Sequence, residues 1–329
     1  MVNRDVPLSI NHLPLTIYHS LFTMNELVYA ADLGGTNLRM AAVDNSGGIR
    51  HLTKRPVPHG VSPEELMALI GDMAGECRGQ MEKRDFSAVA FTAPSPVAKD
   101  FDGVLTKLPN LPTITGMNLK EELHKLFGLP VFIENDATAA GIGEHWIGAT
   151  RGVENSICVT LGTGIGGGII INNEPLRGKD GTGGEIGHIC VEPDGRPCGC
   201  GSHGCVEQYA SATAIARMAV EAGMNATSAA EVYEAWTAGD KHAKAVFNTM
   251  GRYLGIMLAG LSNALNPETI VVCGGVTAGW DAFAGRVESE IATRAYPVVA
   301  ARAKLVRGTL GDNAGILGAA RSAFLAAQN

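Results

Sequence analysis

The sequence predicts an α/β protein built from two similar lobes around a cleft. Strand-like apolar runs alternate with amphipathic helical patterns along most of the chain, which is typical of this class. A glycine-rich hairpin between two buried strands occurs twice, about 130 residues apart, which indicates an internal repeat. The chain has 329 residues, enough for two lobes at about 100–200 residues per domain.

The first half opens with a strand at 26–31, the hairpin Asp32–Asn37 and a second strand at 38–43 that ends in a turn at 45–48. Ser62-Pro-Glu-Glu65 then offers an N-cap serine, a proline at the first helical position and a glutamate three residues after the cap, so a helix follows. The remaining elements of this half are a strand at 87–92, a helix at 118–127, a strand at 131–134 and a helix at 137–146.

The second half starts in the same way, with a strand at 156–161, a glycine turn at 162–168 and a strand at 169–171. A loop-rich stretch over 172–204 precedes helices near 206–223, 229–238 and 241–264, a strand at 269–273, the turn Gly274-Gly275, a helix near 280–295, a strand near 304–307 and a helix from Ala314. We therefore expect an extension at 1–26, a small lobe at 27–136 and a larger lobe at 137–329, with the final helix free to pack back on the first lobe.

Charge and cysteine content restrict the class of partner and the compartment. With 26 Lys+Arg against 33 Asp+Glu, the net charge is −7, which disfavours duplex nucleic acid or an anionic membrane as the main partner. Seven cysteines, an odd number in a chain of this size, do not predict a disulfide framework. Neither a signal-peptide core nor an apolar 18-residue run occurs, so we expect a cytoplasmic protein.

The two hairpins are candidate phosphate-binding loops. Asp32-Leu-Gly-Gly-Thr-Asn37 and Leu161-Gly-Thr-Gly164 both expose backbone N–H groups that no Cβ shields, next to a threonine hydroxyl. An ordinary glycine hairpin is the alternative, but the duplication favours phosphate binding. Neither loop is a Walker or Rossmann motif, because each leads into a strand and not into a helix.

Asp136 is a candidate general base. Glu134-Asn-Asp136 joins a strand to a helix, so Asp136 is expected at the positive end of the helix dipole, which favours the ionised carboxylate. The alternative is that Asp136 only caps the helix. Local sequence does not decide between these roles.

His188, Cys198, Cys200 and Cys205 predict a structural zinc site. Three thiolates and one imidazole within 18 residues match a closed tetrahedral site, whereas three free thiols in one loop would be unusual. Four protein ligands leave no open position for hydrolytic chemistry. The remaining cysteines are expected to behave as small apolar residues: Cys77, Cys158, Cys190 and Cys273.

Taken together, these motifs resemble the ROK family of repressors and sugar kinases. The resemblance runs from about Leu27 to the C-terminus and is carried by six segments: Asp32–Thr36, Pro109–Leu111, Glu134–Asp136, Leu161–Gly164, Gly184–His188 and Cys198–Glu207. It implies an actin-like ATPase (ribonuclease H-like) fold and ATP-dependent phosphorylation of a hexose, with glucose first.

The resemblance also implies roles for individual residues. Asp136 would take the proton of the sugar 6-hydroxyl, and Mg²⁺ would bind near Asp32. The other sugar-binding residues would be Asn110, Asn135, Glu185, His188 and Glu207. The nucleotide-binding residues would be Asp32, Gly34, Gly35, Thr36, Asn37, Gly162, Thr163, Gly164, Gly274 and Gly275. Family members suggest a homodimer or homotetramer.

The sequence departs from the family pattern at two places. Thr92 and Ser95 replace glycines of a loop expected to line the sugar 2-position, so we expect glucose and then mannose to be preferred over N-acetylmannosamine and N-acetylglucosamine. Asn37 stands where many members have lysine, and Arg39 lies two residues on. A kinase for an N-acetylhexosamine or another hexose is the alternative. A sugar-responsive repressor or a catalytically silent protein is the remaining possibility, although residues 1–26 are too few for a winged helix-turn-helix.

Overall fold

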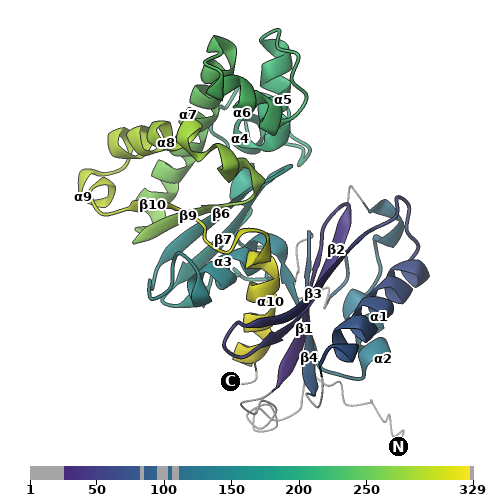
Figure 1. Ribbon diagram of the computed structural model, residues 1–329. Helices are drawn as coiled ribbons and strands as arrows, with labels where there is room; N and C mark the ends of the chain where they lie inside the picture. The colour runs from purple at the N-terminus through teal and green to yellow at the C-terminus, as the bar shows by residue number, and fades with distance from the viewer. Residues whose placement is uncertain (1–25, 82–84, 95–102, 106–110, 327–329) are drawn as a thin grey trace, which may run out of the picture.

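The computed structural model describes residues 26–81, 85–94, 103–105 and 111–326. Two five-stranded mixed sheets form the centres of two lobes, one in each half of the chain (Figure 1). The predicted α/β class is confirmed. Helices cover the outer faces of the sheets, and two helices lie between the sheets.

The first sheet has the strand order β3-β2-β1-β4-β5. Its strands are β1 (Leu27–Leu33), β2 (Asn37–Asp44), β3 (Ile49–Pro56), β4 (Phe86–Ala93) and β5 (Val131–Asn135). The first three strands form an antiparallel meander, whereas β4 and β5 run parallel to β1. The carboxyl ends of β1, β4 and β5 therefore meet at one edge, where the loops that carry polar side chains emerge.

The second sheet repeats this topology. Its strands are β6 (Ser156–Leu161), β7 (Ile165–Ile171), β8 (Glu174–Pro175), β9 (Thr269–Cys273) and β10 (Lys304–Arg307). Their order, β10-β9-β6-β7-β8, equals that of the first sheet with β6 in the place of β1. Again the first three strands are antiparallel and the last two are parallel to the first strand. The internal repeat predicted from the glycine hairpins is confirmed.

Helices α3 (Asp136–Ile147) and α10 (Ala314–Ala326) lie between the two sheets (Figure 1). The first packs on β6 and β7, the second on β1, β2 and β4, and the two helices pack on each other. A Cβ on Gly318 would lie 1.6 Å from the carbonyl oxygen of Ala139, so only glycine permits this crossing. The last helix of the chain therefore covers a face of the first sheet.

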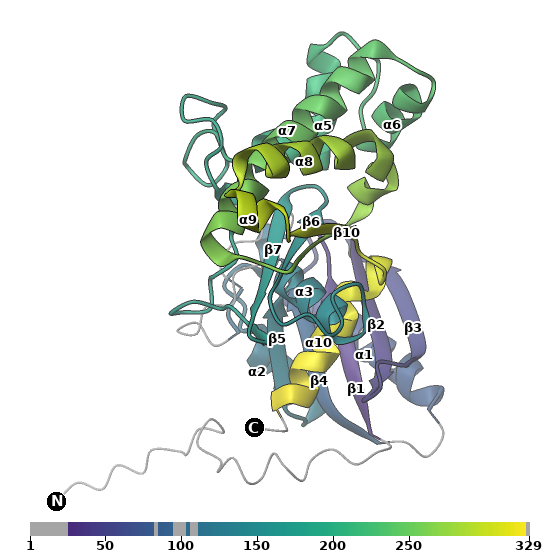
Figure 2. The same cartoon turned by 90° about the vertical axis from the view of Figure 1, so that its left-hand side faces the viewer.

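The remaining helices cover the outer faces. In the first lobe, α1 (Pro63–Gly79) starts with the predicted capping box and α2 (Leu119–Phe127) starts after the predicted cap Asn118. In the second lobe the helices are α4 (Glu207–Ala210), α5 (Ala212–Glu221), α6 (Ala229–Thr237), α7 (Lys241–Leu265), α8 (Trp280–Arg294) and α9 (Pro297–Ala300). Figure 2 shows α5, α6, α7 and α8 above the sheet of this lobe.

The short elements β8 and α9 were not predicted, and three longer elements also differ from the expectation. Strand β3 was not predicted, because its charged side chains face solvent at the sheet edge. The predicted helix at 206–223 is divided, because Ser211 caps α5 through its side chain. Strand β7 begins at Ile165, although 162–168 was expected to be a turn. A Cβ on Gly168 would lie 2.6 Å from the carbonyl oxygen of Ala137, so these glycines are strand residues that let α3 approach the sheet.

Candidate active site

The first hairpin presents a half-buried acidic group, Asp32, at the end of β1. Asp32 pairs in register with Arg39 on β2 and with Thr92 on β4. The Thr92 hydroxyl donates to Oδ1 of Asp32 at 2.5 Å. Burial raises the pKa of Asp32, while the Thr92 hydrogen bond and the Arg39 charge oppose that shift. A carboxylate oxygen at this position suits Mg²⁺, which prefers hard oxygen ligands.

The second hairpin presents backbone and no charge of its own. Its turn is closed by a hydrogen bond from the N–H of Gly162 to the carbonyl oxygen of Gly164, and the space beside Gly162 is open. The N–H of Ile165 donates to Oε2 of Glu207 at 3.0 Å. A Cβ on Gly164 would lie 2.4 Å from that same oxygen. The end of the predicted zinc loop therefore lies directly against this hairpin.

Asp136 is the first residue of α3 and does not cap it. The cap is Asn135, whose Oδ1 accepts the N–H groups of Ala137 and Thr138, both at 3.1 Å. Oδ1 of Asp136 accepts the N–H of Ala137 at 2.8 Å, which leaves Oδ2 for another partner. The reading of Asp136 as a mere cap is therefore wrong, because the preceding asparagine fills that role.

The environment of Asp136 suits proton transfer near neutral pH. Burial, together with the negative charges of Asp32 and Glu185, raises the pKa of Asp136 to about 6, against the opposing hydrogen bond from Ala137. Asp32 comes from the first lobe and Glu185 from the loop after the second hairpin. A carboxyl group with a pKa of about 6 is mostly ionised at pH 7 and is still a useful base.

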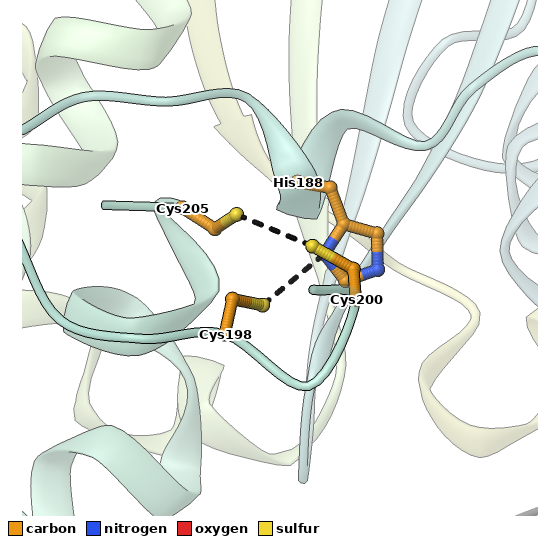
Figure 3. Close-up of side chains that lie close together, drawn as sticks. All are labelled: His188, Cys198, Cys200 and Cys205. Atoms are coloured by element: carbon orange, nitrogen blue, oxygen red, sulfur yellow. Dashed lines mark hydrogen bonds between the residues drawn. The ribbon is translucent and has the colours of Figure 1, made fainter. Parts of the chain in front are cut away.

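The four predicted metal ligands converge in one loop, shown in Figure 3. One ligand atom from each of His188, Cys198, Cys200 and Cys205 lies within 4.8 Å of all the others. Sγ of Cys198 lies 3.6 Å from Nδ1 of His188, and the Sγ atoms of Cys200 and Cys205 are 3.7 Å apart. Two cysteine sulfurs this far apart are not a disulfide.

These distances fit a tetrahedral zinc site. Zn–S bonds of about 2.3 Å and Zn–N bonds of about 2.0–2.1 Å place two sulfurs about 3.8 Å apart and a sulfur about 3.5–3.6 Å from a nitrogen. The second ring nitrogen of His188, Nε2, lies 4.0 Å from Oε2 of Glu185, within ion-pair range but beyond a hydrogen bond. The imidazole thus lies next to both the cysteine cluster and one of the carboxylates that raise the pKa of Asp136.

A third component is a cleft of about 250 Å³ at the carboxyl ends of β9 and β10. The predicted turn Gly274-Gly275 lines one side of it. Sequence reasoning did not identify its other lining residues, among them Thr277, Arg307 and Asp312. Arg39 donates to the carbonyl oxygen of Asp312 and to Oδ1 of Asn313 at 2.5 Å, so the first hairpin reaches this cleft.

Some predicted residues behave differently or are not described. Asn110 and Ser95 lie outside the described residues. Thr92 is fully buried and bonded to Asp32, so its side chain does not narrow an open sugar pocket as expected. Cys190 is exposed and lies outside the cluster of His188, Cys198, Cys200 and Cys205, so its assignment as a small apolar residue is wrong. Asn37 donates to the hydroxyl of its neighbour Thr36 at 2.9 Å.

Comparison with known proteins gives consistent results. The sequence model of the ROK family matches residues 28–326. A glucokinase from Halalkalibacterium halodurans is 36% identical over 87% of this chain and 92% of its own. A ROK family glucokinase from Streptomyces griseus, solved with glucose and AMPPNP, superposes with a TM-score of 0.77 at 33% identity over 91% of this chain and 99% of that chain.

A ROK family transcriptional regulator, homologous to the E. coli MLC protein, superposes with a TM-score of 0.82 at 27% identity over 93% of this chain and 80% of that chain. The fold is therefore shared by kinases and regulators, and the site must distinguish them. Among the described residues, no helix is both long and apolar enough to span a membrane.

Proposed function

The chain belongs to the ROK family and is a sugar kinase of the glucokinase type, and we propose that Asp136 is the general base with which it phosphorylates glucose. The reaction transfers the γ-phosphoryl group of ATP to the sugar 6-hydroxyl. The observation that carries the assignment is the position of Asp136 at the start of α3, between the first hairpin and the loop of Glu185, with its pKa raised to about 6.

Asp136 accepts the 6-hydroxyl proton as the sugar oxygen bonds to the γ-phosphorus and the bond from that phosphorus to ADP breaks. Its Oδ1 is held by the N–H of Ala137, so Oδ2 is the oxygen that takes the proton. The raised pKa matches this task, because a base near the working pH combines ionisation with proton affinity. Proton transfer of this kind contributes about 10²–10⁴ in rate.

The other sugar contacts follow from which atoms remain unengaged. Asn135 uses Oδ1 for the helix cap, so it offers its amide N–H groups to the sugar. Glu207 holds Ile165 with Oε2 and keeps Oε1 for a hydroxyl. Glu185 and Nε2 of His188 lie together and offer a second polar pair. Asn110 is proposed from its motif alone.

The nucleotide is expected to lie across both hairpins. Gly34, Gly35 and Thr36 from one lobe and Gly162, Thr163 and Gly164 from the other would bind the phosphates, with Asn37 beside them and the adenosine in the cleft next to Gly274 and Gly275. Asp32 would hold Mg²⁺, which supplies positive charge to the phosphates when bound. Two hairpins from separate lobes can also close on the substrates and exclude water.

Zinc is proposed as a structural ion of the sugar pocket. The four side chains His188, Cys198, Cys200 and Cys205 would fill its coordination sphere, so it would take no part in the chemistry. Its proposed role is positional, because Nδ1 of His188 faces the cluster while Nε2 faces Glu185. Glu207, two residues after Cys205, depends on the same loop for its contact with Ile165.

An ADP-release assay with ATP and Mg²⁺ tests the proposal. We expect the kcat/KM for glucose to exceed that for mannose, and both to exceed that for N-acetylmannosamine and N-acetylglucosamine. A kcat/KM for an N-acetylhexosamine above that for glucose would show that glucose is not the preferred substrate. A homodimeric or homotetrameric state and a cytoplasmic location stay predictions, to be tested by light scattering and cell fractionation.

A further inference from the structure

Within the part of the chain that the structure describes, Thr92 is the one hydroxyl residue that donates to the carboxylate of the first hairpin. It lies at the carboxyl end of β4, fully buried, in register with Asp32 on the neighbouring parallel strand. Residues paired in register project from the same face of a sheet. The Thr92 hydroxyl therefore reaches sideways to Oδ1 of Asp32, at 2.5 Å.

This hydrogen bond fixes Oδ1 of Asp32 and leaves Oδ2 available for another partner. A carboxylate rotates about its last bond unless a donor holds it, because that torsion is broad. Gly315, at the start of α10, lies close on another side, since a Cβ there would be 3.7 Å from Oδ1 and 3.9 Å from Oδ2. With Oδ1 engaged by Thr92, Oδ2 is the oxygen left to accept from outside the protein.

We propose that Thr92 is a positioning residue, whose hydroxyl orients Asp32 so that Oδ2 faces the Mg²⁺ of the bound nucleotide. The inference rests on the proposed function, since it assumes a magnesium nucleotide beside Asp32. Thr92 itself touches neither substrate. It holds the Asp32 carboxylate in the orientation needed to bind the metal, so less conformational entropy is lost when the magnesium nucleotide binds.

The test measures nucleotide binding without sugar and without turnover. Calorimetry gives the Kd of AMPPNP with Mg²⁺ and with EDTA for wild type, Thr92→Val and Thr92→Ser. We expect Thr92→Val to weaken Mg²⁺–AMPPNP by about tenfold, the worth of a hydrogen bond to a charged group, and to leave metal-free AMPPNP and glucose within about twofold. Thr92→Ser, which keeps the hydroxyl, should restore most of the loss.

A matched control is Thr53→Val. Thr53 is also a buried threonine of the first sheet and lies on the outer strand β3. Its hydroxyl donates to Oε2 of Glu76 at 3.1 Å. This variant should bind Mg²⁺–AMPPNP like wild type. The thermal unfolding midpoint of each variant reports whether the substitution disturbs the fold.

Three results would overturn the inference. Thr92→Val could bind Mg²⁺–AMPPNP like wild type, or it could weaken glucose and both nucleotide forms equally without rescue by Thr92→Ser, as a purely structural residue would. Wild-type binding of AMPPNP that Mg²⁺ does not strengthen would also overturn it. Failure of the proposed function is read separately, as absence of ADP release with glucose and ATP.

Discussion

The two hairpins have the same topology and opposite chemistry. At the end of β1, Asp32 pairs with Arg39 on one side and with Thr92 on the other. At the equivalent place on β6, Thr160 pairs with Gly166 and with Cys273. An acid and a cation thus face each other at the end of β1, with a hydroxyl from β4 beside them, whereas the equivalent place on β6 has only small uncharged side chains.

Under the proposed function, this difference divides the work of phosphoryl transfer between the two hairpins. The charged groups proposed to orient a metal and to act on the phosphates lie on one side, and a second set would add unpaired charge to a closed site. The second hairpin offers its backbone and is held from behind by Glu207. The sugar contacts proposed on this side come from the neighbouring loop and not from the side chains of the hairpin.

The largest expected effect is at Asp136, which lies at the start of α3, between the first hairpin and the loop of Glu185. Asp136→Asn should lower kcat by about 10²–10⁴ and leave the glucose Kd nearly unchanged, because the amide cannot accept the hydroxyl proton. Single-turnover kinetics and calorimetry measure both quantities. A kcat near that of wild type would remove Asp136 from the role of base.

Asp281→Asn is the matched control, because Asp281 also lies in the first turn of a helix, α8, where it accepts from the hydroxyl of Tyr233. It should turn over at the wild-type rate.

Asp136→Asn should also be more stable than the wild type above pH 6, by about 1–3 kcal/mol in the free energy of unfolding, because a raised pKa means that the charged carboxylate destabilises the fold there. That gain should fade as the pH falls toward 4.

The second effect separates the sugar side from the nucleotide side. Cys198→Ser should reduce bound zinc from about one equivalent per chain to well below one half and raise the glucose Kd by about 10–100-fold. The AMPPNP Kd should rise less than the glucose Kd, because the phosphates are proposed to bind both hairpins and the cysteine loop supports the second hairpin through the contact of Glu207 with Ile165. Elemental analysis and calorimetry provide the readouts.

Cys190→Ser is the control, since Cys190 is an exposed thiol of the same loop outside the cluster. It should keep both zinc and glucose affinity. A wild-type protein that contains no zinc and still phosphorylates glucose at full rate would contradict the zinc proposal.

The third effect is the pH dependence of kcat/KM, which reports the free enzyme. Because Asp136 must be ionised, kcat/KM should fall as the pH drops through about 6, by about tenfold per unit below it. The charge of Asp32 raises this pKa, so Asp32→Asn should move the acid limb to lower pH. Thr160→Val, the equivalent change in the other hairpin, should not move it, and an equal shift in both variants would contradict the comparison.

Local features were predictable from the sequence because their signals are short. The capping box of α1 spans four residues, β6 has the predicted bounds, and the four predicted metal ligands lie within a single loop. In each of these cases the interacting groups are close along the chain. For such local contacts, the identity of the side chains and their spacing along the chain are enough to predict which residues interact.

Contacts between distant segments were not predictable. The bond between Thr92 and Asp32 joins residues 60 positions apart, and the bonds from Arg39 to Asp312 and Asn313 join residues more than 270 positions apart. Such contacts depend on strand register and on how α10 returns to the first sheet. Thr92 was accordingly expected in the sugar pocket, although register directs it to Asp32.

The smallest expected effect concerns Arg39, which has only a glycine as its counterpart in the second hairpin. Arg39→Gln removes the charge near Asp32 and the bonds to Asp312 and Asn313 at the nucleotide cleft. The KM for ATP should rise by about three- to tenfold, as expected for a partly exposed charged hydrogen bond, while the KM for glucose stays constant. Arg55→Gln is the control, because Arg55, on the neighbouring strand β3, is also a partly exposed arginine and its guanidinium pairs with Glu76 of α1. If both variants, or both substrates, respond alike, then the charge of the first hairpin acts through general stability and the two hairpins are equivalent at this position.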